Sequence, residues 1–200
     1  MSLVFFDLET TGLKDARIVS ISAICDGKTF DSYVNPGIPI PVEASRVHGL
    51  YDADVSTAQP WSVVGLEFAR WVYKHAGPEP VLVAYNGTGF DFKVLLENNA
   101  LFCPAKSFPQ FGTLKASDPY VVAKSVINKG ETPNLRQASV YQHLFGVQPT
   151  GQHSSLGDVE ALAKIAQHPR FVKEVAASAK AMAPLDGRLW LETKQRKEKK

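Results

Sequence analysis

The hydrophobic pattern of the chain predicts strands first and mostly helices later. Residues 3–9 form an apolar run with two acids in it, and a turn signal at Asp26-Gly27 separates two further strand-like runs, 17–25 and 28–34. Apolar residues spaced three and four apart then predict helices. The expected helices cover 42–47, 61–75, 92–101, 118–126, 135–145, 155–167 and 170–183, and the further strands cover 81–85 and 110–115. This order is typical of one α/β domain with a mixed sheet.

Composition excludes several protein classes. Of the 200 residues, 44% are hydrophobic and 21% are charged, which excludes a disordered chain or a fibre. The two cysteines form neither a C-x-x-C pair nor a cluster with histidine, so we expect no disulfide framework or structural zinc. No apolar run approaches the roughly 20 residues of a membrane helix. We recognise no secretory signal and expect an intracellular protein, cytoplasmic and/or nuclear.

Positive charge gathers in the last residues. Residues 194–200 hold five basic residues and one acid, although the whole chain has a net charge of only +2. We expect residues 1–186 to form the folded domain and 187–200 to form a basic, flexible tail. The tail could contact nucleic acid, act as a nuclear signal or simply be solvated, and the sequence leaves these readings open.

Two carboxylates interrupt the most apolar segment. On a strand, Asp7 and Glu9 point to the same side as Phe5. Isolated buried carboxylates cost several kcal/mol each unless they are paired or bound to a cation. We therefore expect a cation between them, the alternative being an exposed strand end with both acids solvated.

Two more acids occupy the apolar faces of predicted helices. Asp91 precedes Val94 and Leu95 at i+3 and i+4, although an acid at a helix start can also just complement the helix dipole. Asp158 is followed at i+3, i+4 and i+7 by apolar residues, which places it on a buried face. Those residues are Ala161, Leu162 and Ile165.

Together, these residues indicate a chemistry. Carboxylate oxygens without thiolates favour Mg²⁺ or Mn²⁺, and two such ions can stabilise both the attacking and the leaving oxygen of a phosphodiester. His153, five residues before Asp158, could take a proton from the attacking water at neutral pH. If the segments meet, the sequence predicts metal-dependent phosphodiester hydrolysis.

Three ordered motifs resemble those of the DnaQ-like 3′→5′ exonucleases. Residues 6–12 (FDLETTG) resemble the first motif, 86–91 (NGTGFD) the second, and 153–158 (HSSLGD) the third in its histidine form. This is the DEDDh signature, and the resemblance runs from about Leu3 to Ile165. Within the family, residues 135–166 are most similar to TREX-type DNases.

The resemblance implies a fold and a catalytic set. The fold is RNase H-like, a five-stranded mixed sheet flanked by helices, with the exonuclease domain at 1–186. Asp7, Glu9 and Asp158 would hold the ion that carries the nucleophilic water. Asp7 would also bind the second ion, supported by Asp91, and His153 would be the general base.

The resemblance also implies substrate contacts. Thr10, Thr11, Gly12 and Leu13 would contact the 3′-terminal nucleotide. Tyr85 and Asn86 would lie near the scissile phosphate.

The implied reaction releases nucleoside 5′-monophosphates from the 3′ end of DNA. Single-stranded DNA is favoured over RNA on the subfamily resemblance, and a single strand is favoured because the terminal base must leave a stack to reach such a site. One alternative is an exoribonuclease or oligoribonuclease with the same chemistry. Another is a non-catalytic or proofreading subunit bound to a polymerase. A homodimer is left open.

Overall fold

The structure is a computed structural model that describes residues 2–102 and 114–181. The predicted tail 187–200, Cys103 and most of the predicted strand 110–115 lie outside these residues. Within the described part of the chain, no helix has the length and apolar character needed to cross a bilayer.

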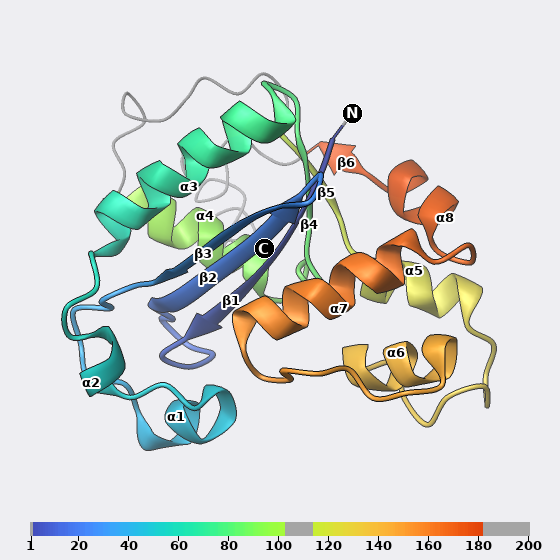
Figure 1. The fold of residues 1–200 in the computed structure, drawn as a ribbon, viewed down its shortest axis with the longest axis horizontal. Coiled ribbons are helices and arrows are strands. Elements are labelled where there is room, and N and C mark those ends of the chain that lie inside the picture. The colour runs from blue at the N-terminus through green and yellow to red at the C-terminus, as the bar shows by residue number, and fades with distance from the viewer. Residues whose placement is uncertain (1, 103–113, 182–200) are drawn as a thin grey trace, which may run out of the picture.

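A mixed sheet forms the centre of the molecule (Figure 1). Its strands are β1 (Leu3–Thr10), β2 (Ile18–Cys25), β3 (Lys28–Tyr33), β4 (Val81–Val83), β5 (Lys115–Ser117) and β6 (Lys180–Ala181). Their order is β3-β2-β1-β4-β5-β6, with β1, β4 and β5 parallel to one another and the remaining pairs antiparallel. The predicted five-stranded mixed sheet is thus confirmed, and the two-residue β6 extends it.

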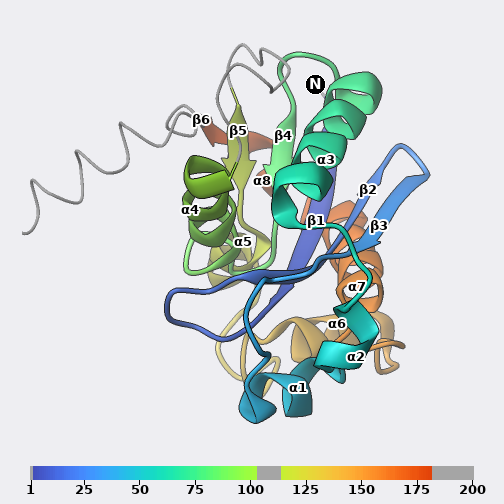
Figure 2. The same ribbon diagram turned by 90° about the vertical axis from the view of Figure 1, so that its left-hand side faces the viewer.

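Helices cover both faces of this sheet (Figures 1 and 2). One face carries α3 (Trp61–Ala76) and α4 (Asp91–Phe102). The other carries α5 (Pro119–Val126), α6 (Gln137–Phe145), α7 (Ser155–Gln167) and α8 (Val172–Ala177). Two short helices, α1 (Val42–His48) and α2 (Asp52–Val55), lie beyond one end of the sheet.

Strand β1 alternates as its sequence predicts. Val4, Phe6 and Leu8 belong to the core under α3 and α4, whereas Phe5 packs into the core under α7. Because side chains alternate along a strand, Asp7 and Glu9 share the face of Phe5 and point toward the α7 layer. The prediction that both acids face one side of the sheet is therefore confirmed.

Some element boundaries were predicted wrongly. Of the predicted strand 110–115, the structure describes residues 114 and 115. Only Lys115 belongs to β5, which runs from Lys115 to Ser117. The predicted helix 170–183 ends at Ala177, because residues 180–181 pair with β5 instead. The hydroxyl of Ser117 reinforces this change by donating to the carbonyl of Val175 at 2.8 Å.

Candidate functional site

Three carboxylates from two distant segments converge beside the sheet. Asp7 and Glu9 come from β1 and Asp158 comes from the first turn of α7, and one carboxylate oxygen of each lies within 4.8 Å of the others. Asp91 is at the start of α4, after β4, and is only 5% exposed. Because β4 runs parallel to β1, this fourth acid reaches the same end of the sheet. We call these four residues the carboxylate cluster.

Burial and mutual repulsion raise the pKa values of the cluster. Burial raises the pKa of Asp7 well above its usual range, and the charges of Asp91, Glu9 and Asp158 add to the effect. Burial and then the charge of Asp158 raise the pKa of Glu9 to about 8. Burial raises the pKa of Asp91 to about 7, although backbone hydrogen bonds oppose the change.

Asp158 also has a raised pKa, but its contact with His153 limits the increase. Burial raises the pKa, while a hydrogen bond from the backbone of His153 and the nearness of its imidazole lower it. For Asp7, Glu9 and Asp91, the charged neighbours that shift the pKa are all acids. Such a concentration of like charge fits a hard divalent cation.

A tight loop presents His153 beside Asp158. The backbone N–H of His153 donates to Oδ2 of Asp158 at 2.9 Å, and the residue has a φ of 64° with its side chain exposed. The loop packs directly on α7, since a Cβ on Gly157 would lie 2.1 Å from the carbonyl oxygen of Gly151. Ser154 caps the helix by accepting from Gly157 N at 3.2 Å.

Buried serines fasten the start of α7 to the sheet. Ser22 and Ser20 are the β2 partners of Asp7 and Glu9. The hydroxyl of Ser155 lies 2.7 Å from that of Ser22 and 3.1 Å from that of Ser20. These bonds fix the first turn of α7, and hence Asp158, over the two acids of β1.

Asp118 organises the loop that leads to Asp91. Its carboxylate is buried and accepts from Asn86 N at 2.8 Å, Thr88 N at 3.0 Å and Tyr120 N at 3.0 Å. Asn86 is held at a φ of 57°. The sequence indicated only a helix start at Asp118-Pro119. Its contact with a loop 30 residues away depends on the pairing of β4 with β5.

The predicted contacts of the terminal nucleotide lie in the turn after β1. Thr10 and Thr11 are buried, and their hydroxyls bond within this turn, to Gly12 and to the N–H of Arg17. The β1–β2 register shifts between Glu9 and Thr10. Gly12 is half-buried, and Leu13, in contrast, is 86% exposed.

The two other predicted contacts lie after β4. Tyr85 is half-buried, and its hydroxyl donates to the carbonyl of Leu135 at 2.7 Å, while Asn86 is exposed. Further along the same segment, the side chain of Gln137 donates to the carbonyl of Asp158 at 2.7 Å. Residues 135–137 therefore connect the loop after β4 with the start of α7.

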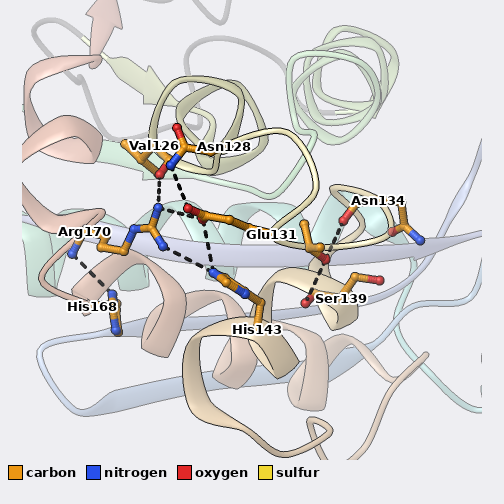
Figure 3. Close-up of polar contacts among 9 residues, drawn as sticks. Val126, Asn128, Glu131, Asn134, Ser139, His143, His168 and Arg170 are labelled. Carbon is orange, nitrogen blue, oxygen red and sulfur yellow. Dashed lines mark hydrogen bonds and ion pairs between the residues drawn. The ribbon is translucent and has the colours of Figure 1, made fainter.

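A second polar group joins the loop between α5 and α6 to α6 and to the residues before α8 (Figure 3). Glu131 accepts from Arg170 at 2.9 Å and from Asn128 at 2.7 Å, and lies 3.3 Å from His143 Nε2. Arg170 also donates to the carbonyl of Val126 and lies 3.2 Å from His143 Nε2. We call Glu131, Arg170, His143 and Asn128 the Glu131 cluster.

Comparison with known proteins shows relatives among exonucleases. The RNase_T family model, described as "Exonuclease", matches residues 4–166. A "DNA polymerase III subunit epsilon-like protein" of Rhodobacter capsulatus is 31% identical over 82% of this chain and 23% of that protein. "Three-prime repair exonuclease 1" of Bos taurus is 27% identical over 90% of this chain and 67% of that protein. The chain thus spans only about a quarter of the bacterial relative.

A solved structure shows the same fold. Escherichia coli Exonuclease I in complex with a dT13 oligonucleotide has a TM-score of 0.65 and 18% identity, covering 87% of this chain and 41% of that one. This similarity confirms the RNase H-like exonuclease fold that the motifs implied. With the family match over residues 4–166, it follows that the chain belongs to the RNase_T exonuclease family, within the DnaQ-like 3′→5′ exonuclease superfamily.

Proposed function

We propose that this chain is a metal-dependent 3′→5′ exonuclease that removes nucleoside 5′-monophosphates from single-stranded DNA. The observation that carries the proposal is the carboxylate cluster, in which three acidic oxygens lie within 4.8 Å of one another. Such an arrangement is unfavourable without a cation, and His153 stands beside it as a potential base.

The residues of the cluster fit a pair of divalent ions. All the donors are carboxylates, and their raised pKa values reflect a site that favours added positive charge. We propose that Asp7, Glu9 and Asp158 hold one Mg²⁺ or Mn²⁺, and that Asp7 with Asp91 holds the second. When bound, two such ions supply water activation and stabilisation of the attacking and leaving oxygens.

The remaining side chains would position the substrate and move the proton. His153 would accept a proton from the attacking water, with its backbone held by Asp158. The Thr10–Leu13 turn would receive the last nucleotide, and Tyr85 and Asn86 would lie near the scissile phosphate. Residues 1–186 would form the catalytic domain, with 187–200 as the basic tail.

The named relatives favour DNA as the substrate. A repair exonuclease matches over 90% of the chain, and the structural neighbour is a complex with a DNA oligonucleotide. A second function, proofreading as part of a polymerase assembly, is favoured by the relative named as epsilon-like. Turnover by the isolated chain would exclude a purely non-catalytic role, and co-purification with a polymerase would support the proofreading role.

The test uses 5′-labelled single-stranded DNA and RNA of the same sequence, with Mg²⁺, Mn²⁺ or EDTA. We expect stepwise shortening of DNA from its 3′ end that stops in EDTA and in the Asp7→Asn variant. Faster shortening of RNA would move the proposal to an exoribonuclease. Absence of cleavage for both polymers would contradict the enzyme assignment.

A further inference from the structure

A row of polar side chains crosses three strands of the sheet. Asp7 of β1 pairs with Ser22 of β2, and Ser22 pairs with Asp31 of β3, the strand at one edge of the sheet. Because directly paired residues lie on the same face, all three side chains share the face that α7 covers. Asp31 is exposed, whereas Ser22 is fully buried. The row therefore connects an acid at the surface with the carboxylate cluster.

The hydrogen bonds along this row can run in only one direction. An ionised carboxylate only accepts, so Ser22 must donate its single hydroxyl proton to Asp31 Oδ1, 2.5 Å away. The hydroxyl of Ser22 then accepts from that of Ser155, at 2.7 Å. Ser155 has no proton left for Ser20, so Ser20 is the donor in their contact of 3.1 Å. We call the hydroxyls of Ser20, Ser155 and Ser22 the serine chain, and Asp31 is its final acceptor.

We infer that Asp31 acts through the serine chain to hold Asp158 in position for a divalent cation. Ser155 begins α7, three residues before Asp158, so the direction of its hydrogen bonds orients the turn that carries this acid. A hydrogen bond to a charged acceptor is stronger than one between neutral groups, and bonds in a row strengthen one another. The inference rests on the proposed function, since it concerns how Asp158 is held near the acids of β1.

Removing the final acceptor should weaken metal binding. In Asp31→Ala, the serine chain holds three protons for two contacts between hydroxyls, so a buried hydroxyl loses its hydrogen bond. We expect the Kd for Mn²⁺, measured from the electron paramagnetic resonance signal of the free ion, to rise about tenfold. Asp31→Asn keeps an acceptor oxygen and should recover most of the affinity.

Matched controls test the same strand and the same charge elsewhere. Thr29→Ala removes another exposed side chain from β3, and Glu67→Gln removes an exposed acid from α3. Both should bind Mn²⁺ like the unmodified protein. Asp31 is exposed at a sheet edge, so its replacement should leave the fold intact, and Tm in EDTA checks this.

A double-mutant cycle separates the hydrogen bonds from the charge of Asp31. Ser22→Ala breaks the serine chain at its link to Asp31 and should raise the Kd by a similar factor. Adding Asp31→Ala to Ser22→Ala should then change the Kd no further. A through-space effect of the negative charge would instead persist at full size in the Ser22→Ala background. The Mg²⁺ concentration for half-maximal cleavage of 5′-labelled single-stranded DNA should rise with the Kd, while the KM for DNA stays unchanged.

The outcomes distinguish the positioning role from the activity. A rise in Kd that Asp31→Asn reverses and that Ser22→Ala makes non-additive supports the role. Additive effects, or Kd values equal to those of the controls, would overturn it, and normal cleavage of DNA would leave the proposed function standing. The expected shifts in Kd without any cleavage by the unmodified protein would support the role and contradict the nuclease. No binding of Mn²⁺ by the unmodified protein would overturn both.

Discussion

The carboxylate cluster and the Glu131 cluster group charged side chains in opposite ways. In the Glu131 cluster, the acid has Arg170 and Asn128 as partners, and these hydrogen bonds lower the pKa of Glu131. In the carboxylate cluster, acids face acids and their pKa values rise. In the Glu131 cluster, the protein itself supplies the partners of the acid. In the carboxylate cluster, the repulsion between the acids is relieved only when a cation binds.

The two clusters therefore predict opposite dependences of stability on pH. A group whose pKa is lower in the folded protein than in the unfolded chain stabilises the fold above the unfolded-state pKa. This stabilisation is lost as the pH falls through the folded-state pKa. A group whose pKa is higher in the folded protein contributes stability below the unfolded-state pKa. This contribution is lost as the pH rises through the folded-state pKa. A set of variants and conditions can test this contrast.

The largest effect is expected from neutralising an acid of the carboxylate cluster. Asp7→Asn should reduce kcat by about a thousandfold, because about 4 kcal/mol of transition-state stabilisation is lost with the ligand. The same change should raise the Tm in EDTA at pH 8, because it removes a repelling charge. Exonuclease assays and thermal melts measure the two effects. Retained activity would show that Asp7 is not a metal ligand.

A smaller loss of activity is expected from replacing Asp118, whose carboxylate accepts hydrogen bonds from backbone N–H groups. Asp118→Ala leaves buried donors without partners, at a cost of about 1–3 kcal/mol in unfolding free energy for an unsatisfied group. The loop before Asp91 should loosen, and kcat should fall about tenfold. Asp118→Asn, which keeps one acceptor oxygen, should recover part of both losses. Equal activity in all three proteins would exclude a positioning role.

Removal of the metal should have a pH-dependent effect on stability. In EDTA, the Tm should fall as pH rises through about 7 and about 8, the pKa values of Asp91 and Glu9. Added Mg²⁺ or Mn²⁺ should raise the Tm more at pH 8 than at pH 6, with protons released on binding. Calorimetry and melts across this range measure both. A Tm in EDTA that is independent of pH would contradict the raised pKa values.

The smallest effect is expected in the Glu131 cluster. Glu131→Gln keeps the shape of the side chain but removes a partly exposed charge and one of the two acceptor oxygens, so only one of the hydrogen bonds from Asn128 and Arg170 can remain. We expect a slight decrease in Tm at pH 7, a flatter Tm between pH 3 and pH 5, and unchanged activity. A loss of activity comparable to that of Asp7→Asn would place this cluster in the catalytic centre.

Local patterns predicted most of the elements but not where distant segments would meet. The alternation of β1 correctly placed Asp7 and Glu9 on one face, and the period of α7 correctly placed Asp158 over buried residues. The four-residue α2 and the two-residue β6 are too short for any period to reveal. The end of the last helix at Ala177 depends on pairing with β5, which no local signal encodes.

The same limit applied to the candidate site. The four acids of the carboxylate cluster were found from the sequence because each interrupts a pattern of apolar residues that predicts burial. Asp118 was missed because an acid before Pro119 is fully explained as a helix cap, which it also is. Its second set of partners arises only when β4 and β5 pair.

The serine bonds between β2 and α7 also bear on how the protein is made. The contact between Ser22 and Ser155 joins residues 133 positions apart in the chain. Contacts of such long range form only after the intervening chain is available, during synthesis as well as refolding. A nascent chain thus holds the acids of β1 long before α7 leaves the ribosome. On the proposed function, the centre assembles only when Asp158 is in place, so we expect an unfinished chain to have no nuclease activity.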